Sequence, residues 1–504
     1  MSGVCTVRVE LELVGVWVEV SADVVAGLRW TRGLAGTSPR DRVAGTGLCE
    51  FALRNDARNA GGTAGWYSPN HASVRTGFTF GIAVRVIAND GSDRPQWYGR
   101  LRSILPDAGQ FGTRQTHCTA QDYMGDLAEA QVRTMPAQVT KTEVELLQAI
   151  LAALPAELQP AATSYDTALD SYPYAFYDTG GGANAMDLAN RVVTSTQGYL
   201  YVRNDGTLRY DNRHTVALRS SSVTFTDASL LAPDGLSVPS SLENVYNRVR
   251  LTIHQTTQVP ATVLCTLSGA QAVGPGETQD IWLDYTDPDT PHSLIGGTGF
   301  TTPIVATTDY LGNAQADGLG ANLTANLSIV TSPFAATVKF AVTNTGAALV
   351  YVTFLQLRGT AIYDNAPLTA ESYTAQPYGD RPLDIDLPYQ VDANVAQDLA
   401  DYLKARYLTL ANQVDAHAFD PQRTAALMTH ALTREIGDVV TVSETQTGIA
   451  AVELLILGIE MTVGQKTHLT CRYRVTPRGS GFVFVLDDAV RGVLDSTVAV
   501  LGYA

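Results

Sequence analysis

The sequence predicts a multidomain, mainly β protein with α+β parts. Alternation of apolar and polar residues, which is the period of a half-buried strand, recurs along much of the chain and begins at residues 4–13. Charged residues make up only 17% of the 504 positions, and Gly, Thr and Ala are abundant, as in β-rich modules with neutral polar faces. A chain of this length is expected to divide into three or four domains of roughly 100–200 residues each.

The first predicted domain is a β-barrel or β-sandwich over residues 1–118. Strand-like segments follow one another at 4–13, 47–55, 77–90 and 97–107. Asn, Asp, Gly and Pro residues between them favour turns. Successive strands of this kind predict an antiparallel sheet.

Residues 119–230 are predicted to form a small α+β domain. Thr142 and Glu145 have the spacing of a capping box in front of the apolar segment LLQAILAAL. The next helix, NAMDLANRVVTSTQG, is expected to end with Gly198 at its C-cap. The segment after it, YLYVRNDGTLRYDNR, has the NDG turn of a β-hairpin.

Residues 256–357 are predicted to be an inserted β-sandwich. The segment is rich in Thr, Gly, Ala and Asn, and Lys339 is its only Lys or Arg. The sequences on either side of it, NRVRLTI and LRGTAIY, resemble each other, because both mix Arg and Thr with apolar residues. We therefore expect the insert to interrupt a single domain made of residues 231–255 and 358–479. A domain tolerates such an insertion when the two ends of the insert lie close together.

The stretch after the insert combines one helix with three strands. The helix NVAQDLADYLKARYL carries an apolar face at Val395, Leu399 and Leu403. A Gly-Asp kink precedes the strand IGDVVTV, and the apolar strands AAVELLILGIEMTV and THLTCRYRVTP follow. Residues 480–504 are apolar and too short for a domain, so they are expected to dock on the chain's own body or on a partner.

Several motifs occur in a particular order: RVAGTGLCEFALRN, AQDYMGDLAEA, AMDLANRVVTSTQGYLYVRNDGTLRY, IGDVVTVSE and RYRVTP. This succession resembles the central hub proteins of bacteriophage tail tips and baseplates. Each motif alone is common, so the order carries the resemblance. It covers most of the chain apart from residues 256–357 and about the last twenty.

The resemblance implies a homotrimer in which residues 1–118, and 231–255 together with 358–479, are two tail-tube-like hub domains. Three subunits would then present six similar modules and adapt a six-fold tail tube to a three-fold tip. The family implies a structural virion protein of the tail tip, made in the host bacterial cytoplasm. Its implied partners are the distal tail protein, the tail tube, the tape-measure protein and a tip or receptor-binding protein. Subunit contacts are expected at the IGDVV and RYRVTP strands.

The charge balance fits a channel better than a nucleic-acid-binding surface. A formal net charge of −16 is opposite to the basic stripe of proteins that grip DNA. It suits a lumen, lined by carboxylates, through which DNA passes without sticking. The first residues lack a secretory pattern, and no apolar segment approaches the roughly 20 residues of a membrane helix.

No catalytic, cofactor or metal site is predicted. The five cysteines are scattered without a CxxC pair, and no HExxH occurs among the eight histidines. The Asp178-Thr179-Gly180 segment looks like an aspartic-protease loop but has no second copy, and Gly180–Gly182 lacks the following GK[ST] of a phosphate loop. Several acidic groups are interpreted as solvated turns rather than glycosidase or calcium ligands: Asp284, Asp287 and Asp289; Asp384 and Asp386; Asp487 and Asp488.

Two alternatives to a structural role remain. The first is a host-polysaccharide adhesin acting through the insert, where four aromatic residues could stack on sugar rings: Trp282, Tyr285, Phe300 and Tyr310. Aromatic residues of a β-sandwich are at least as often part of its core. The second is a tail-associated hydrolase that cuts the cell wall with one of the Asp pairs.

Overall fold

The computed structural model describes residues 4–108, 114–133, 135–179, 182–227, 229, 235–239, 242–243, 245–287, 295–408, 414, 416–464, 468–478, 482–483 and 499–500. These residues form a mostly β structure of several open sheets, which confirms the predicted fold class, with no closed barrel among them. Within the same residues, no helix is long and apolar enough to cross a membrane.

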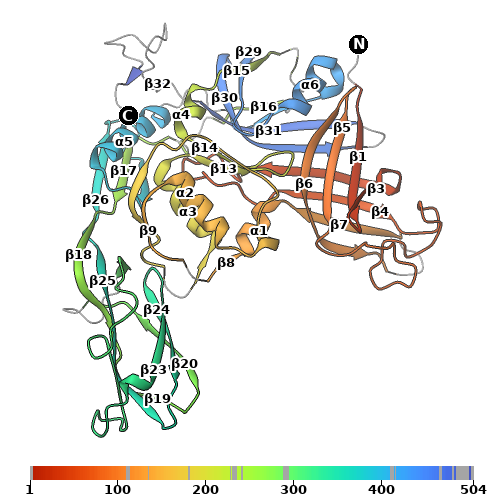
Figure 1. Ribbon diagram of the computed structural model, residues 1–504. Coiled ribbons are helices and arrows are strands. Elements are labelled where there is room, and N and C mark those ends of the chain that lie inside the picture. The colour runs from red at the N-terminus through yellow and green to blue at the C-terminus, as the bar shows by residue number, and fades with distance from the viewer. Residues whose placement is uncertain are drawn as a thin grey trace.

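The largest element is a sheet of thirteen strands that joins the two ends of the sequence (Figure 1). Its order is β16-β28-β31-β30-β3-β4-β7-β6-β5-β1-β2, with β29 pairing β30 and β15 pairing β29. The strands are β1 (Thr6–Leu13), β2 (Val16–Glu19), β3 (Val24–Gly33), β4 (Leu48–Arg54), β5 (Ala83–Asn89), β6 (Asp93–Pro106), β7 (Gln115–Gln121), β15 (Ser221–Phe225), β16 (Leu236–Ser237), β28 (Ala416–Phe419), β29 (Val439–Glu444), β30 (Ile449–Val463) and β31 (Leu469–Pro477).

The N-terminal and C-terminal strands meet where β3 runs antiparallel to β30, a line that we call the seam. The register runs from Arg29 opposite Thr462 to Gly33 opposite Gly458. Gly33 has φ +105°, and a Cβ atom there would lie 2.4 Å from the carbonyl oxygen of Leu457. Only glycine allows the two backbones to approach so closely.

Residues between β7 and β15 form a small α+β unit against the long sheet. Its elements are α1 (Tyr123–Glu129), β8 (Gln131–Val132), β9 (Gln138–Thr142), α2 (Glu143–Ala152), β10 (Thr163–Tyr165), β11 (Ser171–Ala175), β12 (Ala183–Asn184), α3 (Ala185–Thr196), β13 (Tyr199–Val202), β14 (Leu208–Asp211) and α4 (Arg213–Leu218). Their apolar side chains belong to the same continuous core as those of the long sheet. The unit and the sheet therefore pack as one body.

Local signals in the α+β unit are largely confirmed. Thr142 and Glu145 form the predicted capping box at the start of α2. The end of α3 is a correction, because Gln197, with φ +57°, takes the left-handed conformation and not Gly198. Gly198 serves packing instead: a Cβ atom there would lie 2.6 Å from the ring of Tyr210.

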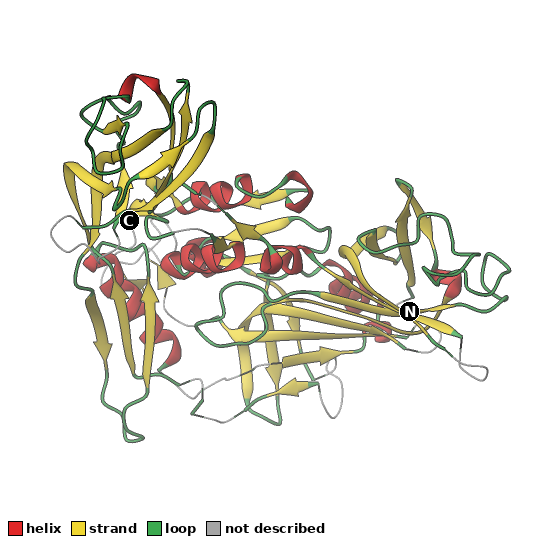
Figure 2. Cartoon of the chain, turned by 90° about the horizontal axis from the view of Figure 1, so that it is seen from below, coloured by secondary structure: helices red, strands yellow, loops and turns green. Residues whose placement is uncertain are grey.

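Residues 256–364 form a lobe on the side of the molecule away from the N-terminal strands (Figures 1 and 2). Its strands are β18 (Thr256–Thr266), β19 (Gln271–Val273), β20 (Thr278–Asp284), β21 (Gly296–Thr298), β22 (Tyr310–Asn313), β23 (Leu327–Pro333), β24 (Thr337–Asn344) and β25 (Val350–Asp364). One sheet is built around β25 and the other is β20-β24-β23, with a separate apolar core shared by both. The amide of Ala335 donates to the carbonyl of Met135 at 3.1 Å and so ties the lobe to the α+β unit.

A third unit carries the lobe. It consists of β17 (Arg248–Ile253), β26 (Leu368–Tyr373) and β27 (Pro382–Leu387), covered by helix α5 (Ala393–Tyr407), and it has its own core. The chain then returns to the long sheet at β28, and helix α6 (Ala425–Thr433) lies between β28 and β29.

The domain boundaries expected from the sequence stay a prediction. The sheet order shows, however, that strands within 1–118 and 439–477 share one sheet, while β17, β26 and β27 form another. Residues 480–504 lie outside the described residues, apart from the short parallel strands β32 (Phe482–Val483) and β33 (Ala499–Val500). The predicted docking of this tail also stays a prediction.

Candidate assembly surface

One face of the long sheet is polar at the seam. Thr31 on β3, Glu460 on β30 and Arg472 on β31 lie side by side in register. Their sequence neighbours Trp30, Met461 and Cys471 point to the other face and are buried. Side chains alternate along strands, so the apolar residues fix which face the charged residues occupy.

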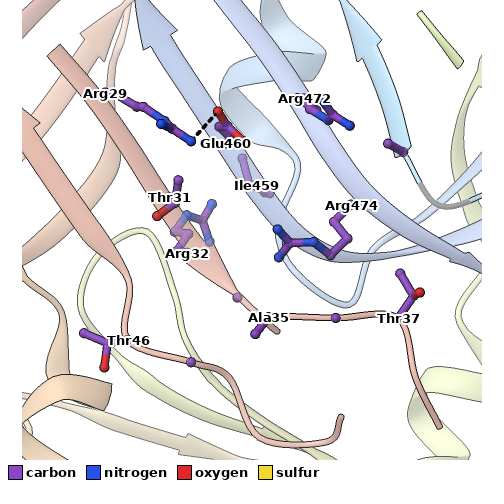
Figure 3. Close-up of a pocket in the computed structure, with 15 residues that line it drawn as sticks. Arg29, Thr31, Arg32, Ala35, Thr37, Thr46, Ile459, Glu460, Arg472 and Arg474 are labelled. Atoms are coloured by element: carbon purple, nitrogen blue, oxygen red, sulfur yellow. Dashed lines mark ion pairs between the residues drawn. The ribbon is translucent and has the colours of Figure 1, made fainter. Parts of the chain in front are cut away.

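A cavity of about 470 Å³ opens on this polar face at the seam (Figure 3). We call it the seam pocket. Its charged lining residues are Arg29, Arg32, Glu460, Arg472 and Arg474. The loop that follows β3 contributes Ala35, Gly36 and Thr37 to the wall.

The arginines of the seam pocket are not equivalent. Arg29 pairs with Glu460 at 2.8 Å on the exposed face. Nη1 of Arg474 donates to the carbonyl of Leu34, so that its guanidinium lies over Gly458. Arg472 is exposed, and its side chain has no hydrogen bond or ion pair to any described residue.

Arg32 belongs to the buried side of the seam. It is 6% exposed and forms an ion pair with Glu435, which precedes β29. Glu435 also accepts the amide of Asn204 at 3.1 Å, so one carboxylate links β3, the C-terminal strands and the β13–β14 hairpin. Burial lowers the pKa of Arg32 to about 10. A buried pair of this kind fixes the arrangement of the three segments, because separating it would leave an uncompensated charge.

Backbone hydrogen bonds hold the loop that forms the pocket wall. The amide of Leu34 donates to Leu457 at 2.8 Å, and the amide of Gly45 donates to Gly33 at 3.2 Å. Further along, the amide of Ala44 donates to Leu200 of β13 at 2.8 Å. The wall of the seam pocket is therefore preformed within the chain.

Comparison with solved structures shows which fold the chain has. No protein-family model matches the chain, and no curated protein matches it. The solved structure of the 43 kDa tail protein of prophage MuSo2 from Shewanella oneidensis matches 94% of this chain and 99% of its own, at 11% identity and a TM-score of 0.50. The chain has a phage tail-protein fold.

Two further solved structures match over similar lengths. The tail protein from Neisseria meningitidis MC58 matches 94% of this chain and 96% of its own, at 10% identity and a TM-score of 0.47. Prophage tail protein gp18 from Listeria monocytogenes EGD-e matches 93% of this chain and 94% of its own, at 8% identity and a TM-score of 0.42.

Within this tail-protein fold, the two strands expected to make subunit contacts are already paired on both sides. β29, which contains most of the IGDVV motif, pairs β15 and β30. β31, which contains RYRVTP, pairs β28 and β30. From Cys471 to Arg474, β31 therefore has no free backbone edge, whereas Val475–Pro477 pair β30 alone. The exposed face of β31 carries Arg472 and Arg474, which are available for side-chain contacts.

The four predicted sugar-stacking residues do not share one surface. Tyr285 is fully buried, and its hydroxyl donates to the carbonyl of Phe334 at 3.0 Å. Phe300 and Tyr310 are half-buried and pack against the lobe's core. Trp282 is 51% exposed and stacks on Phe334 with ring centroids 5.7 Å apart. Of the four, only Trp282 is exposed.

Three of the acidic candidates have structural partners. Asp178 pairs with Arg191 at 2.7 Å, Asp384 with Arg250 at 2.6 Å, and Asp386 with His254 at 2.7 Å. All five cysteines are buried and free, and no group of three or more His, Cys, Asp or Glu side chains in the described residues could hold a metal ion. Gly180, Gly181, Asp289, Asp487 and Asp488 lie outside the described residues.

Sequence reasoning missed the seam pocket. One signal was present: in CRYRV, the two arginines alternate with Cys471, Tyr473 and Val475, which predicts a strand with a basic exposed face. The other wall comes from β3, more than 400 residues earlier, and no local pattern in the sequence shows that β3 and β30 pair.

Proposed function

We propose that the chain is a non-enzymatic structural protein of a phage tail, and that it forms the trimeric central hub of the tail tip. Three subunits close a ring around a channel for the tape-measure protein and DNA. The ring adapts the six-fold tail tube and distal tail protein above to a three-fold tip or receptor-binding protein below.

The observation that supports this proposal most strongly is the fold match over nearly the whole of both chains, at 94% and 99% coverage. The long sheet is consistent with it, because strands from both ends of the sequence build a single wall. Because both ends of the sequence contribute to this one sheet, each subunit can act as a rigid segment of a closed ring.

The channel is proposed to keep DNA from sticking. The net charge of −16 supports a lumen with a surplus of carboxylates. The seam pocket, which has more arginines than carboxylates, is a local exception to this balance. A basic lumen in a structure of the trimer would overturn this part of the proposal.

Immunogold labelling of virions tests the placement at the tip. Antibodies against the purified chain should label the distal end of the tail in particles of the phage or prophage that encodes it. Label along the whole tail, or none on intact or mildly disrupted particles, would contradict the proposed position.

A host-polysaccharide adhesin is the second candidate, and the exposure of Trp282 favours it. An exposed indole can stack on a sugar ring. The full chain should then bind bacterial surface glycans on an array, and Trp282→Ala should remove that binding. Tyr285→Phe is the matched control, since Tyr285 is buried and its ring cannot reach a ligand. An unchanged array profile for Trp282→Ala would exclude Trp282 as the contact.

A further inference from the structure

The seam pocket holds a local excess of positive charge in an acidic chain. Arg32 is neutralised by Glu435, and among the described lining residues Glu460 is the one carboxylate against Arg29, Arg472 and Arg474. Glu460 forms its ion pair with Arg29 of β3, and β3 flanks β30 on the side opposite β31. Arg472 and the remaining donors of Arg474 therefore have no anionic partner among the described residues.

The two arginines are spaced by the strand that carries them. They stand two residues apart on the same face of β31, which corresponds to about 7 Å at the rise of a strand. Arg474 is held toward β3 by its bond to Leu34, and small residues, Gly458 and Ala416, lie opposite it on the neighbouring strands. Both arginines line the cavity of the seam pocket, and Figure 3 shows them on neighbouring parts of its wall.

We propose that the seam pocket binds an acidic protein segment in extended conformation, with two carboxylates at alternate positions bonded to Arg472 and Arg474. Alternate side chains of an extended segment also lie about 7 Å apart on one face, so the spacing of the ligand matches that of the arginines. A guanidinium group offers a planar pair of donors that fits a carboxylate, and such charge-assisted bonds are among the stronger ones in proteins.

A protein segment fits the pocket better than a nucleic acid does. Nucleic-acid binding depends on neutralising many phosphates along a basic stripe. Among the described residues of the lining, two arginines lack an anionic partner, and Glu460 lies between them and Arg29. The chain as a whole carries a net charge of −16. A ligand with two carboxylates meets far less repulsion from such a surface than a polyanion does.

Fluorescence anisotropy with dye-labelled peptides tests the proposal on the full chain. The probe is an acetylated, amidated peptide of alternating Thr and Glu. The controls are the same peptide with Gln for Glu and an oligothymidylate of similar length. At low salt the Glu peptide should bind saturably, with a Kd on the order of 1 mM or below, and binding should weaken as salt rises. The measurement needs neither a ring nor a virion, so its failure is distinguishable from failure of the proposed hub function.

Arg472→Gln is the central variant, because Arg472 has no partner within the described residues and its loss should not disturb the fold. It should weaken binding of the Glu peptide by about tenfold, while Glu460→Gln should strengthen it by removing a like charge. Arg133→Gln, at an exposed arginine outside the pocket, is the matched control and should bind as the unaltered chain does.

Three results would overturn the proposal: no saturable binding of the Glu peptide, equal binding by Arg472→Gln and the unaltered chain, or tighter binding of oligothymidylate than of the Glu peptide. Arg472→Lys adds a check on geometry. It keeps the charge but loses the planar donor pair, so its affinity should fall between those of arginine and glutamine at this position.

Discussion

The buried environment of His417 makes the stability of the folded protein depend on pH. It lies on β28, is 0% exposed, and packs against Phe225, Phe419 and Tyr473. Burial lowers the pKa of its ring to about 3, well below the 6.5 of an exposed histidine. The folded protein therefore keeps the ring neutral, while the unfolded chain binds a proton below about pH 6.5. The stability that this difference supplies is present above pH 6.5 and is lost as the pH falls toward 3.

Replacing His417 with Phe should remove this dependence. Relative to that of the unaltered chain, the free energy of unfolding of His417→Phe should rise by about 1.4 kcal/mol for each pH unit below 6.5. At pH 4.5 the difference should be about 2–3 kcal/mol. Urea unfolding of both proteins from pH 4.5 to 8 measures the difference. The comparison must be between the two proteins, because the pKa of buried Asp122 is raised to about 7 and its contribution has the opposite sign. Parallel curves for the two proteins would refute the assignment.

Among the elements, the seam between β3 and β30 joins the two ends of the chain. Gly33→Ala should destabilise it strongly, because the added Cβ would meet the backbone of Leu457 and Gly458 at 2.4 and 2.7 Å. Gly27→Ala is the matched control: it also has positive φ, but nothing lies within 4 Å of its Cβ position. In the control, the free energy of unfolding should fall by only about 1–2 kcal/mol, the cost of placing alanine in a left-handed conformation. Gly33→Ala should lower it by several kcal/mol more. Equal losses in urea unfolding would mean that the two strands do not approach as described.

The capping box of α2 offers a second, smaller prediction. Thr142 accepts the amide of Glu145, and the Glu145 carboxylate accepts the amide of Thr142 at 2.9 Å. Thr142→Ala should reduce the free energy of unfolding by about 1 kcal/mol, and Thr142→Ser should retain nearly all of it. Denaturant titration followed by far-UV circular dichroism measures both. A loss for serine as large as that for alanine would show that the hydroxyl group is not what stabilises the helix.

The elements that sequence could predict are those set by neighbouring residues. Alternation predicts β1, capping predicts the start of α2, and helical periodicity predicts α5, and each is confirmed. Pairings between distant segments could not be predicted, because nothing local specifies the partner. Arg32 and Glu435, whose ion pair closes the buried side of the seam, are 403 residues apart. The seam pocket depends on that pairing and was missed for the same reason.

At the scale of the whole molecule, three copies are proposed to close into a ring. A rigid body built from the long sheet and the α+β unit suits this role, because their shared core resists bending at a subunit interface. The lobe and its carrier unit have separate cores, so changes within the lobe should leave the assembly intact.

Native mass spectrometry of the purified full-length chain tests this claim most directly. The dominant species should have three times the 53.8 kDa mass of one chain and should persist on dilution to micromolar concentration. Trp282→Ala, on the lobe, should leave that species unchanged. A chain that remains monomeric at every concentration, or a closed assembly with a number of copies that is not a multiple of three, would contradict the account.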